Sequence, residues 1–151
     1  EQNRAGSMLM LASSMLVSAD NAHALHPNHP ELADPKNAPV MGGGIAVKFN
    51  STLRYTTDGM SAALLRKVCQ KAGVPTQTYY NRADMPGGST LGNISLAHVS
   101  VPTADIGLAQ LAMHSCYETA GSADVNAMIR AVHAFYSTAL SVEGGAVTIL
   151  E

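Results

Sequence analysis

The densest group of side chains that could do chemistry lies between Asp20 and His29. One carboxylate is followed by three imidazoles, at His23, His26 and His29. Carboxylate and imidazole are the ligand types that zinc and related divalent ions take in proteins. The group follows a predicted strand, and open α/β sheets place ligands at the carboxyl ends of their strands. Two interpretations stay open: a ligand or metal site, and a solvated, His-rich loop.

A second candidate segment is formed by residues 110–115 (QLAMHS). Its His114 has mostly small and apolar neighbours, so it is either a buried core residue or a ligand. Cys116 has no further Cys/His pair beside it and is expected to be buried packing. Residues 85–90 (MPGGST) could turn backbone N–H groups toward an anion. They lack the lysine of a phosphate-binding loop, so an ordinary tight turn before a helix is an equal alternative.

An alternation of helices and strands must position these groups. Periodicity predicts an amphipathic helix from Met8 to Leu16 that runs into a short strand at 16–18. Further strands are predicted at 45–49, 76–80 and 103–108, and helices between Asp58 and Gly73, up to Leu96, and from Ser122 to Phe135. Asp58 and Ser122 are the expected N-caps. The predicted fold class is α/β, with a sheet covered on both faces.

Two segments are expected to be irregular. Residues 21–44 carry four prolines and the run Gly42–Gly44, which predicts a long loop, flexible just before the strand at 45–49. The tail at 141–151 is either one last strand or a frayed end.

Composition excludes several classes of protein. Of the 151 residues, 46% are hydrophobic and 13% are charged, which excludes disorder for most of the chain. A net charge of −2 suggests no nucleic-acid partner, and no apolar run is long enough to predict a membrane span. So few charges indicate that much of the surface meets other protein. Two cysteines, eight methionines and no tryptophan fit a reducing, cytoplasmic compartment, and the apolar run at 8–12 lacks the basic flank of a signal peptide.

Four segments, taken in order, closely resemble the aspartyl aminopeptidase family of zinc metallopeptidases. They are residues 18–28 (SADNAHALHPN), 54–58 (RYTTD), 81–92 (NRADMPGGSTLG) and 109–115 (AQLAMHS). The resemblance runs from about Met15 to Phe135. It implies part of a three-layer α/β/α zinc-peptidase catalytic domain with a mixed sheet.

The resemblance implies a site with two zinc ions that share a bridging aspartate. Asp20 matches one later aspartate ligand of the family, and His114 matches its final histidine. The family's early histidine, bridging aspartate and Glu-Glu pair, which includes the general base, have no counterpart here. Residues 1–151 are therefore expected to be the C-terminal part of the catalytic domain, without the upstream part and the inserted oligomerisation domain. We expect the fragment alone to be inactive and assign no catalytic residue within it.

Substrate recognition is better represented. The family removes unblocked N-terminal Asp or Glu, and Lys48 matches a lysine that pairs with the substrate's side-chain carboxylate; without the resemblance, Lys48 would be a surface strand residue. His23 and Tyr55 resemble residues near the scissile carbonyl. Gly87 and Gly88 resemble the loop that lines the pocket.

Outside these matches, His26 is expected to fix its loop and His29 to face solvent. The resemblance predicts a zinc aminopeptidase acting on peptides with N-terminal Asp or Glu, and a large homo-oligomer. Two alternatives from other classes remain: a non-catalytic half-domain that serves as a structural or regulatory subunit, and a small domain that binds an anion through its glycine loop.

Overall fold

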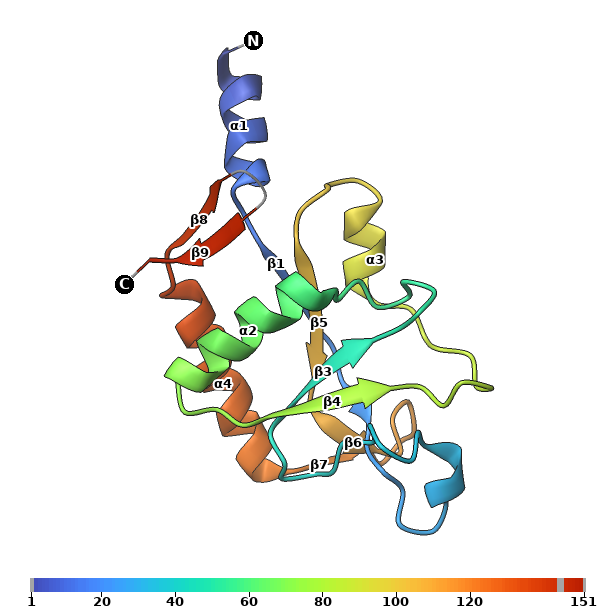
Figure 1. The fold of residues 1–151 in the computed structure, drawn as a ribbon. Coiled ribbons are helices and arrows are strands. Elements are labelled where there is room, and N and C mark those ends of the chain that lie inside the picture. The colour runs from blue at the N-terminus through green and yellow to red at the C-terminus, as the bar shows by residue number, and fades with distance from the viewer. Residues whose placement is uncertain (1, 144–145, 151) are drawn as a thin grey trace.

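The computed structural model describes residues 2–143 and 146–150 as a mixed α/β fold (Figure 1). In chain order the elements are α1 (Gln2–Ala12), β1 (Leu16–Ala19), β2 (Ala22–His23), the 3₁₀ turn η1 (Pro30–Leu32), β3 (Ile45–Phe49), α2 (Gly59–Lys71), β4 (Thr76–Tyr80), α3 (Leu91–Leu96), β5 (Thr103–Gly107), β6 (Ala109–Leu111), β7 (Thr119–Ala120), α4 (Ser122–Tyr136), β8 (Leu140–Glu143) and β9 (Ala146–Ile149). Within these described residues, no helix combines the length and apolar character needed to cross a bilayer.

The main sheet has the strand order β1-β5-β3-β4 and is mixed. β1 runs parallel to β5, β3 runs parallel to β4, and β3 and β5 are antiparallel. Lys48 of β3 pairs in register with Tyr79 of β4. A second, smaller sheet continues from the ends of β1 and β5, with the order β2-β6-β7. The mixed sheet predicted from the resemblance is confirmed.

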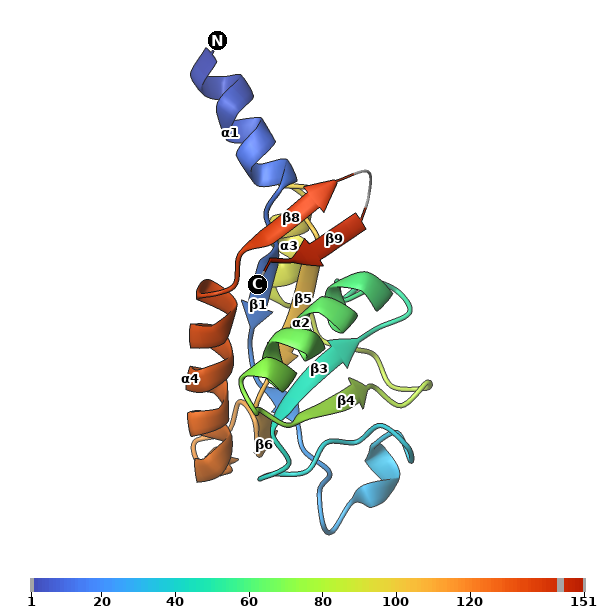
Figure 2. The ribbon, with the colours of Figure 1, turned by 60° about the vertical axis from the view of Figure 1, so that its left-hand side comes forward.

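Helices cover both faces of the main sheet, as Figure 2 shows. On one face α2 and α4 pack on β3 and β5 through an apolar core of side chains that includes Ile45, Val47, Leu65 and Ile106. On the other face α3 contacts β1 and β5. Alternate residues of a strand point to opposite faces, so Lys48 faces away from the α2/α4 layer. The three-layer α/β/α arrangement is confirmed.

Local sequence explains where the helices begin and end. Asp58 caps α2 by accepting from the backbone N–H of Ser61, while the Ser61 side chain accepts from the Asp58 N–H. Gly73, at φ +63°, takes the left-handed conformation that ends this helix. The expectation for α4 is wrong by one residue: Gly121 occupies the N-cap, and Ser122 is the first helical residue.

The glycine run at 42–44 is held in place, which contradicts the prediction of a flexible loop before β3. Asp124 of α4, which is 1% exposed, accepts from the N–H of Gly42 at 2.6 Å and of Gly44 at 2.9 Å. Gln77 donates to the carbonyl of Gly44 at 3.1 Å. A Cβ at Gly44 would approach the Pro75 carbonyl oxygen to 2.2 Å, so only glycine allows this loop to lie against β4. The strand that carries Lys48 therefore starts from a fixed point.

Both ends of the chain differ from the sequence-based expectations. α1 ends at Ala12, so Met15 and Leu16 lie outside it, and its apolar residues 8–11 are exposed. The helix stands away from the sheet (Figure 1), so its apolar side chains are left uncovered by the described residues. In the tail at 141–151, β8 and β9 pair as an antiparallel hairpin. The part of that prediction on residues 144, 145 and 151 lies outside the described residues.

Candidate substrate and metal site

Lys48 is the centre of the candidate site and is 1% exposed, so it is not a surface strand residue. Its Nζ donates to the backbone carbonyl of Asn21 at 3.1 Å and lies 3.8 Å from Oδ2 of Asp20. The ammonium also sits 5.0 Å from the centroid of the Tyr55 ring. Burial lowers the pKa of Lys48, and the carboxylates of Asp20 and Asp105 oppose this by raising it. Lys48 is thus a buried cation whose close carboxylate, that of Asp20, is itself exposed.

Tyr55 covers Lys48 and links it to β4. The Tyr55 side chain is buried, and its ring centroid lies 6.0 Å from that of Tyr79. Burial raises the pKa of the Tyr55 hydroxyl, although hydrogen bonds with Gly88 and Tyr79 lower it. Tyr79 also accepts from Asn81 Nδ2 at 3.1 Å. Tyr55 is thereby a neutral phenol, fixed between the cation and the glycine loop.

The glycine loop packs closely over this region. A Cβ at Gly88 would lie 3.8 Å from the Tyr55 hydroxyl. The carbonyl of Gly87 accepts from Arg54 Nη1 at 3.2 Å, and a Cβ at Gly87 would come within 2.8 Å of Asn50 Nδ2. Any side chain at Gly87 would have to displace these polar groups. The two glycines therefore let the loop lie close to Tyr55 and Asn50.

A buried carboxylate that the sequence analysis missed holds this loop to the sheet. Asp105 of β5 is fully buried and accepts from the N–H and hydroxyl of Thr56 at 2.6 and 2.9 Å, and from the hydroxyl of Thr90 at 2.7 Å. Thr56 follows Tyr55, and Thr90 ends the glycine loop. The available signal was one aspartate inside the otherwise uncharged strand predicted at 103–108, because an unpaired charge is too costly to bury there.

Asp20 and His23 flank the site on the β1–β2 side. Asp20 is 58% exposed, and its Oδ1 accepts from the N–H of Asn21 at 2.7 Å. His23 is exposed on β2, yet partial desolvation lowers the pKa of its imidazole, and positive charge at His114 and Lys48 lowers it further. His23 is therefore predominantly neutral at neutral pH.

The other two histidines of the group lie in the loop that follows. His26 Nδ1 accepts from the N–H of Asn28 at 3.2 Å, consistent with a role in fixing the loop. His29 is 59% exposed and pairs with Glu31 at 3.1 Å.

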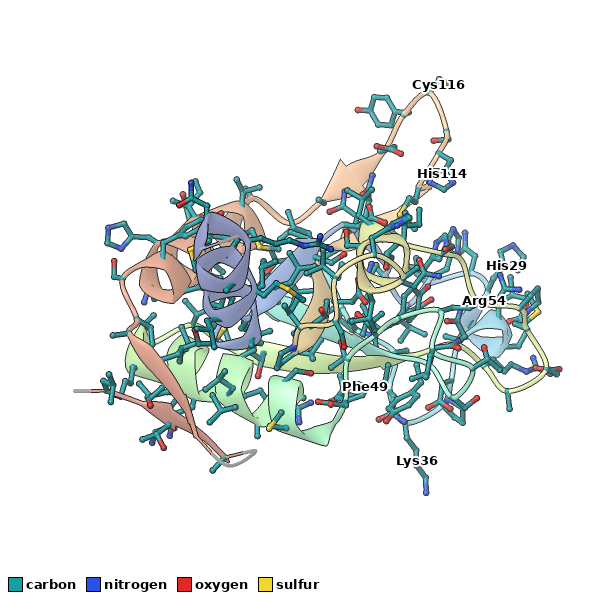
Figure 3. The ribbon with its side chains drawn as sticks, turned by 90° about the horizontal axis from the view of Figure 1, so that it is seen from above. His29, Lys36, Phe49, Arg54, His114 and Cys116 are labelled. Atoms are coloured by element: carbon teal, nitrogen blue, oxygen red, sulfur yellow. The ribbon has the colours of Figure 1, made fainter. Side chains whose placement is uncertain are left out.

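His114 lies on the β6–β7 connection, which projects from the body of the fold together with Cys116 (Figure 3). His114 has φ +71°, and its N–H donates to Glu118 Oε1 at 2.5 Å. It is exposed, so a buried core histidine is excluded. Cys116 is also exposed, and the expectation that it is buried packing is wrong, because the loop turns away from the core.

The residues present fit zinc as a partial set of ligands. Asp20 supplies carboxylate oxygen and His114 supplies imidazole nitrogen, both of which zinc accepts. Both side chains are exposed, so a metal could reach them. Among the described residues, no three His, Cys, Asp or Glu side chains gather closely enough to hold a metal ion. Further ligands would have to come from outside this part of the chain.

A cavity of about 320 Å³ adjoins the site on the far side of Tyr79. Its walls include His23, Asn81, Gln110 and Ala112, together with apolar side chains from the loops. A second depression shares Asn81 and Arg82 with this cavity and extends to Phe49, Arg54 and Gly87. One region is thus surrounded by five of the predicted site residues: Lys48, Tyr55, Gly88, Asp20 and His23. Gly87 lies in the loop at its edge, and His114 comes from the projecting loop.

The fold is a three-layer α/β/α segment with a mixed sheet, and its candidate site holds a buried lysine beside an exposed aspartate. A family model described as "Aminopeptidase I zinc metalloprotease (M18)" matches residues 1–136, so the chain belongs to the M18 family. It is 50% identical over 117 residues to a probable M18 family aminopeptidase 2 of Mycobacterium tuberculosis, and 45% identical to one of Pseudomonas aeruginosa. Each match covers 78% of this chain, but the chain spans only 27% of either relative, about a quarter of its length.

Solved structures show the same fold. The chain superimposes on a chain of an Ape4–Nbr1 complex with a TM-score of 0.84 and 40% identity, over 85% of this chain and 25% of the other. For the Thermotoga maritima M18 aminopeptidase, the TM-score is 0.80 at 26% identity, and the match covers 89% of this chain and 31% of that one. For the S. cerevisiae mApe1 dodecamer the TM-score is 0.77 at 28% identity, and the match covers 86% of this chain and 28% of that one.

Proposed function

We propose that this chain is the C-terminal part of the catalytic domain of a zinc aminopeptidase that removes unblocked N-terminal Asp or Glu from peptides. The observation that carries the proposal is the buried Lys48, whose ammonium is surrounded by the Asn21 carbonyl, the Tyr55 ring and the carboxylate of Asp20. Such a cation favours an anionic ligand, and a neutral one leaves it with fewer partners.

The substrate's side-chain carboxylate pairs with Lys48, beneath the glycine loop. In this arrangement Asp20 contributes its charge to the metal, and the buried Asp105 remains as the protein's own counter-charge to Lys48. With Asp20 engaged by the metal, the substrate carboxylate takes its place as the close anionic partner of the Lys48 ammonium. Tyr55 excludes water on one side, because its buried ring lies across the ammonium.

Asp20 and His114 are the residues of this chain that would hold zinc. When bound, zinc acts as a Lewis acid and makes a water molecule nucleophilic near neutral pH. The remaining ligands and the general-base glutamate are expected in the upstream part of the polypeptide. His23, neutral and close to His114, can donate an N–H to the oxygen of the scissile carbonyl as negative charge develops there.

The same proposal includes a homo-oligomer and a cytoplasmic location. An S. cerevisiae relative of this fold is a dodecamer. Here the exposed apolar residues of α1, from Met8 to Leu11, are a surface that another protein segment could cover.

The proposal is tested with the complete polypeptide loaded with zinc and a panel of peptides that differ only in the N-terminal residue. We expect kcat/KM for Asp and Glu to exceed that for Asn, Gln and Leu. Preferential removal of Leu would contradict an acidic specificity while leaving an aminopeptidase, and no hydrolysis of any peptide would favour a non-catalytic role.

A further inference from the structure

The 320 Å³ cavity beside the site has apolar walls and a small number of polar groups. It lies between the β2–β6 pair and the segment that follows β4. The apolar side chains that line it include Leu32 of η1, Tyr80 at the end of β4, Met85 in the loop after β4 and Leu111 of β6. A largely apolar cavity with a few placed polar groups is the usual form of a site for an organic ligand.

Two acceptor oxygens at this cavity have no hydrogen-bond partner among the described residues: Oε1 of Gln110 and Oδ1 of Asn81. Gln110 is 3% exposed, so water does not compensate its carbonyl freely. A buried acceptor without a donor is costly, and most such groups in proteins are paired. Both oxygens are buried beneath the cavity surface, so either side chain must rotate before its oxygen can accept from a ligand N–H.

The cavity lies next to the place where the proposed reaction occurs. His23 is part of its wall, and Ala112, two residues before His114, forms another part. Tyr79 separates it from the pocket of the acidic residue, because Tyr79 pairs in register with Lys48 and its ring faces Tyr55. A peptide whose first side chain reaches Lys48 and whose first carbonyl lies near His23 would continue into this cavity.

The walls indicate which residue fits. Arg82, at the cavity, is already engaged by the carboxylate of Asp84 at 2.8 Å and by the carbonyl of Glu31. It therefore offers little to an acidic side chain, whereas the apolar walls suit a large aliphatic or aromatic one.

We propose that this cavity binds the residue that follows the scissile bond, with a preference for a large apolar side chain. The inference rests on the proposed function. It adds a second specificity: an acidic first residue followed by a large apolar one.

The test compares two tripeptides, Asp-Leu-Ala and Asp-Gly-Ala, with the complete zinc-loaded polypeptide. Apolar pockets discriminate by about 10- to 200-fold, so we expect kcat/KM for the Leu peptide to exceed that for the Gly peptide by that order. In Ala38→Phe, which fills the cavity from its wall, the ratio should fall toward one while the Gly peptide is still cleaved. The control Ala63→Phe, on the exposed surface of α2, should keep the wild-type ratio.

Equal rates for the two tripeptides in the wild-type protein would overturn the cavity assignment and leave the acidic specificity intact. The same conclusion would follow if Ala38→Phe folded normally and kept the full Leu preference. Failure to cleave either tripeptide would overturn the proposed function and this inference with it.

Discussion

Thr90 donates its hydroxyl to Oδ1 of Asp105 across 2.7 Å, which ties the end of the glycine loop to the middle of β5. The other oxygen of the same carboxylate holds Thr56, next to Tyr55. One buried charge thus fixes two walls of the proposed substrate pocket. Gly92 makes this possible, because a Cβ there would lie 2.7 Å from the carboxylate.

We expect Thr90→Val in the complete polypeptide to raise KM for N-terminal Asp by about 10-fold or more, with little change in kcat, since a hydrogen bond to a charged group contributes about 1.5–3 kcal/mol. The shape of the side chain is kept, but the loop loses its anchor. Thr103→Val is the matched control: Thr103 is also buried on β5, but its hydroxyl donates to the Val101 carbonyl at 2.9 Å rather than to Asp105. Equal effects of the two substitutions on KM would show that Thr90 acts through stability alone.

Asp124 should control how firmly the loop before β3 is held. In Asp124→Ala the N–H groups of Gly42 and Gly44 lose their acceptor, and each unpaired group costs about 1–3 kcal/mol. We expect faster hydrogen exchange in residues 40–44, measured by mass spectrometry. Asp58→Ala removes a carboxylate that accepts from the N–H of Ser61 at the start of α2, so it should accelerate exchange there instead. Unchanged exchange at 40–44 in Asp124→Ala would contradict the assigned role.

The lowered pKa of His23 predicts a pH dependence of stability. Between that lowered pKa and the ordinary value of 6.5, the unfolded chain binds more protons at this position than the folded chain. Stability contributed by neutral His23 is therefore complete above this window and falls as the pH decreases through it. The zinc-free wild-type protein should lose more Tm than His23→Asn between about pH 7.5 and about pH 5.5. Parallel losses of Tm in the two proteins would show that His23 titrates normally.

Zinc retention should depend on Asp20 and His114. In the complete polypeptide, Asp20→Ala and His114→Ala should each lower the bound zinc, measured by metal analysis after dialysis, and abolish hydrolysis. Cys116→Ala, in the same projecting loop as His114, should keep both metal and activity. Near-normal turnover of zinc-replete Asp20→Ala would mean that this aspartate is not a ligand.

The 151-residue chain by itself should retain little zinc, because it offers only two of the expected ligands. Tight, stoichiometric zinc in the purified chain would contradict a partial site.

Local sequence signals predicted the elements with strong periodicity and clear stops. The strands at 45–49 and 76–80 and helix α2 are as expected, because alternation, the Asp58 cap and Gly73 are all local features. The short strands β6 and β7 were missed, since three and two residues carry no readable period and form only by pairing with each other and with β2.

Long-range contacts explain what local patterns could not predict about the site. The roles of Asp105 and Asp124 depend on partners 49 and 82 residues away. Likewise, the burial of Lys48 depends on Tyr55 and the Asn21 carbonyl reaching the same side of the sheet. The resemblance to the family singled out Lys48, but only the fold shows that it is enclosed.

Lys48 is the residue proposed to recognise the substrate's acidic side chain. Lys48→Met keeps much of the stem's packing and removes the charge. A charge-assisted hydrogen bond in a partly dry pocket contributes about 1.5–3 kcal/mol, so kcat/KM for N-terminal Asp should fall about 10- to 150-fold. Activity on N-terminal Asn, which is isosteric and neutral, should be kept or rise. Lys36→Met is the control, because Lys36 is exposed and its side chain points outward (Figure 3). It should leave kcat/KM for N-terminal Asp and for N-terminal Asn unchanged.

The most direct measurement is therefore the ratio of kcat/KM for N-terminal Asp to that for N-terminal Asn in wild-type and Lys48→Met polypeptide. We predict a large fall of this ratio in the variant, since a folding defect alone would lower both values together. An unchanged ratio would contradict the proposed role of Lys48 and place the acidic specificity elsewhere in the protein.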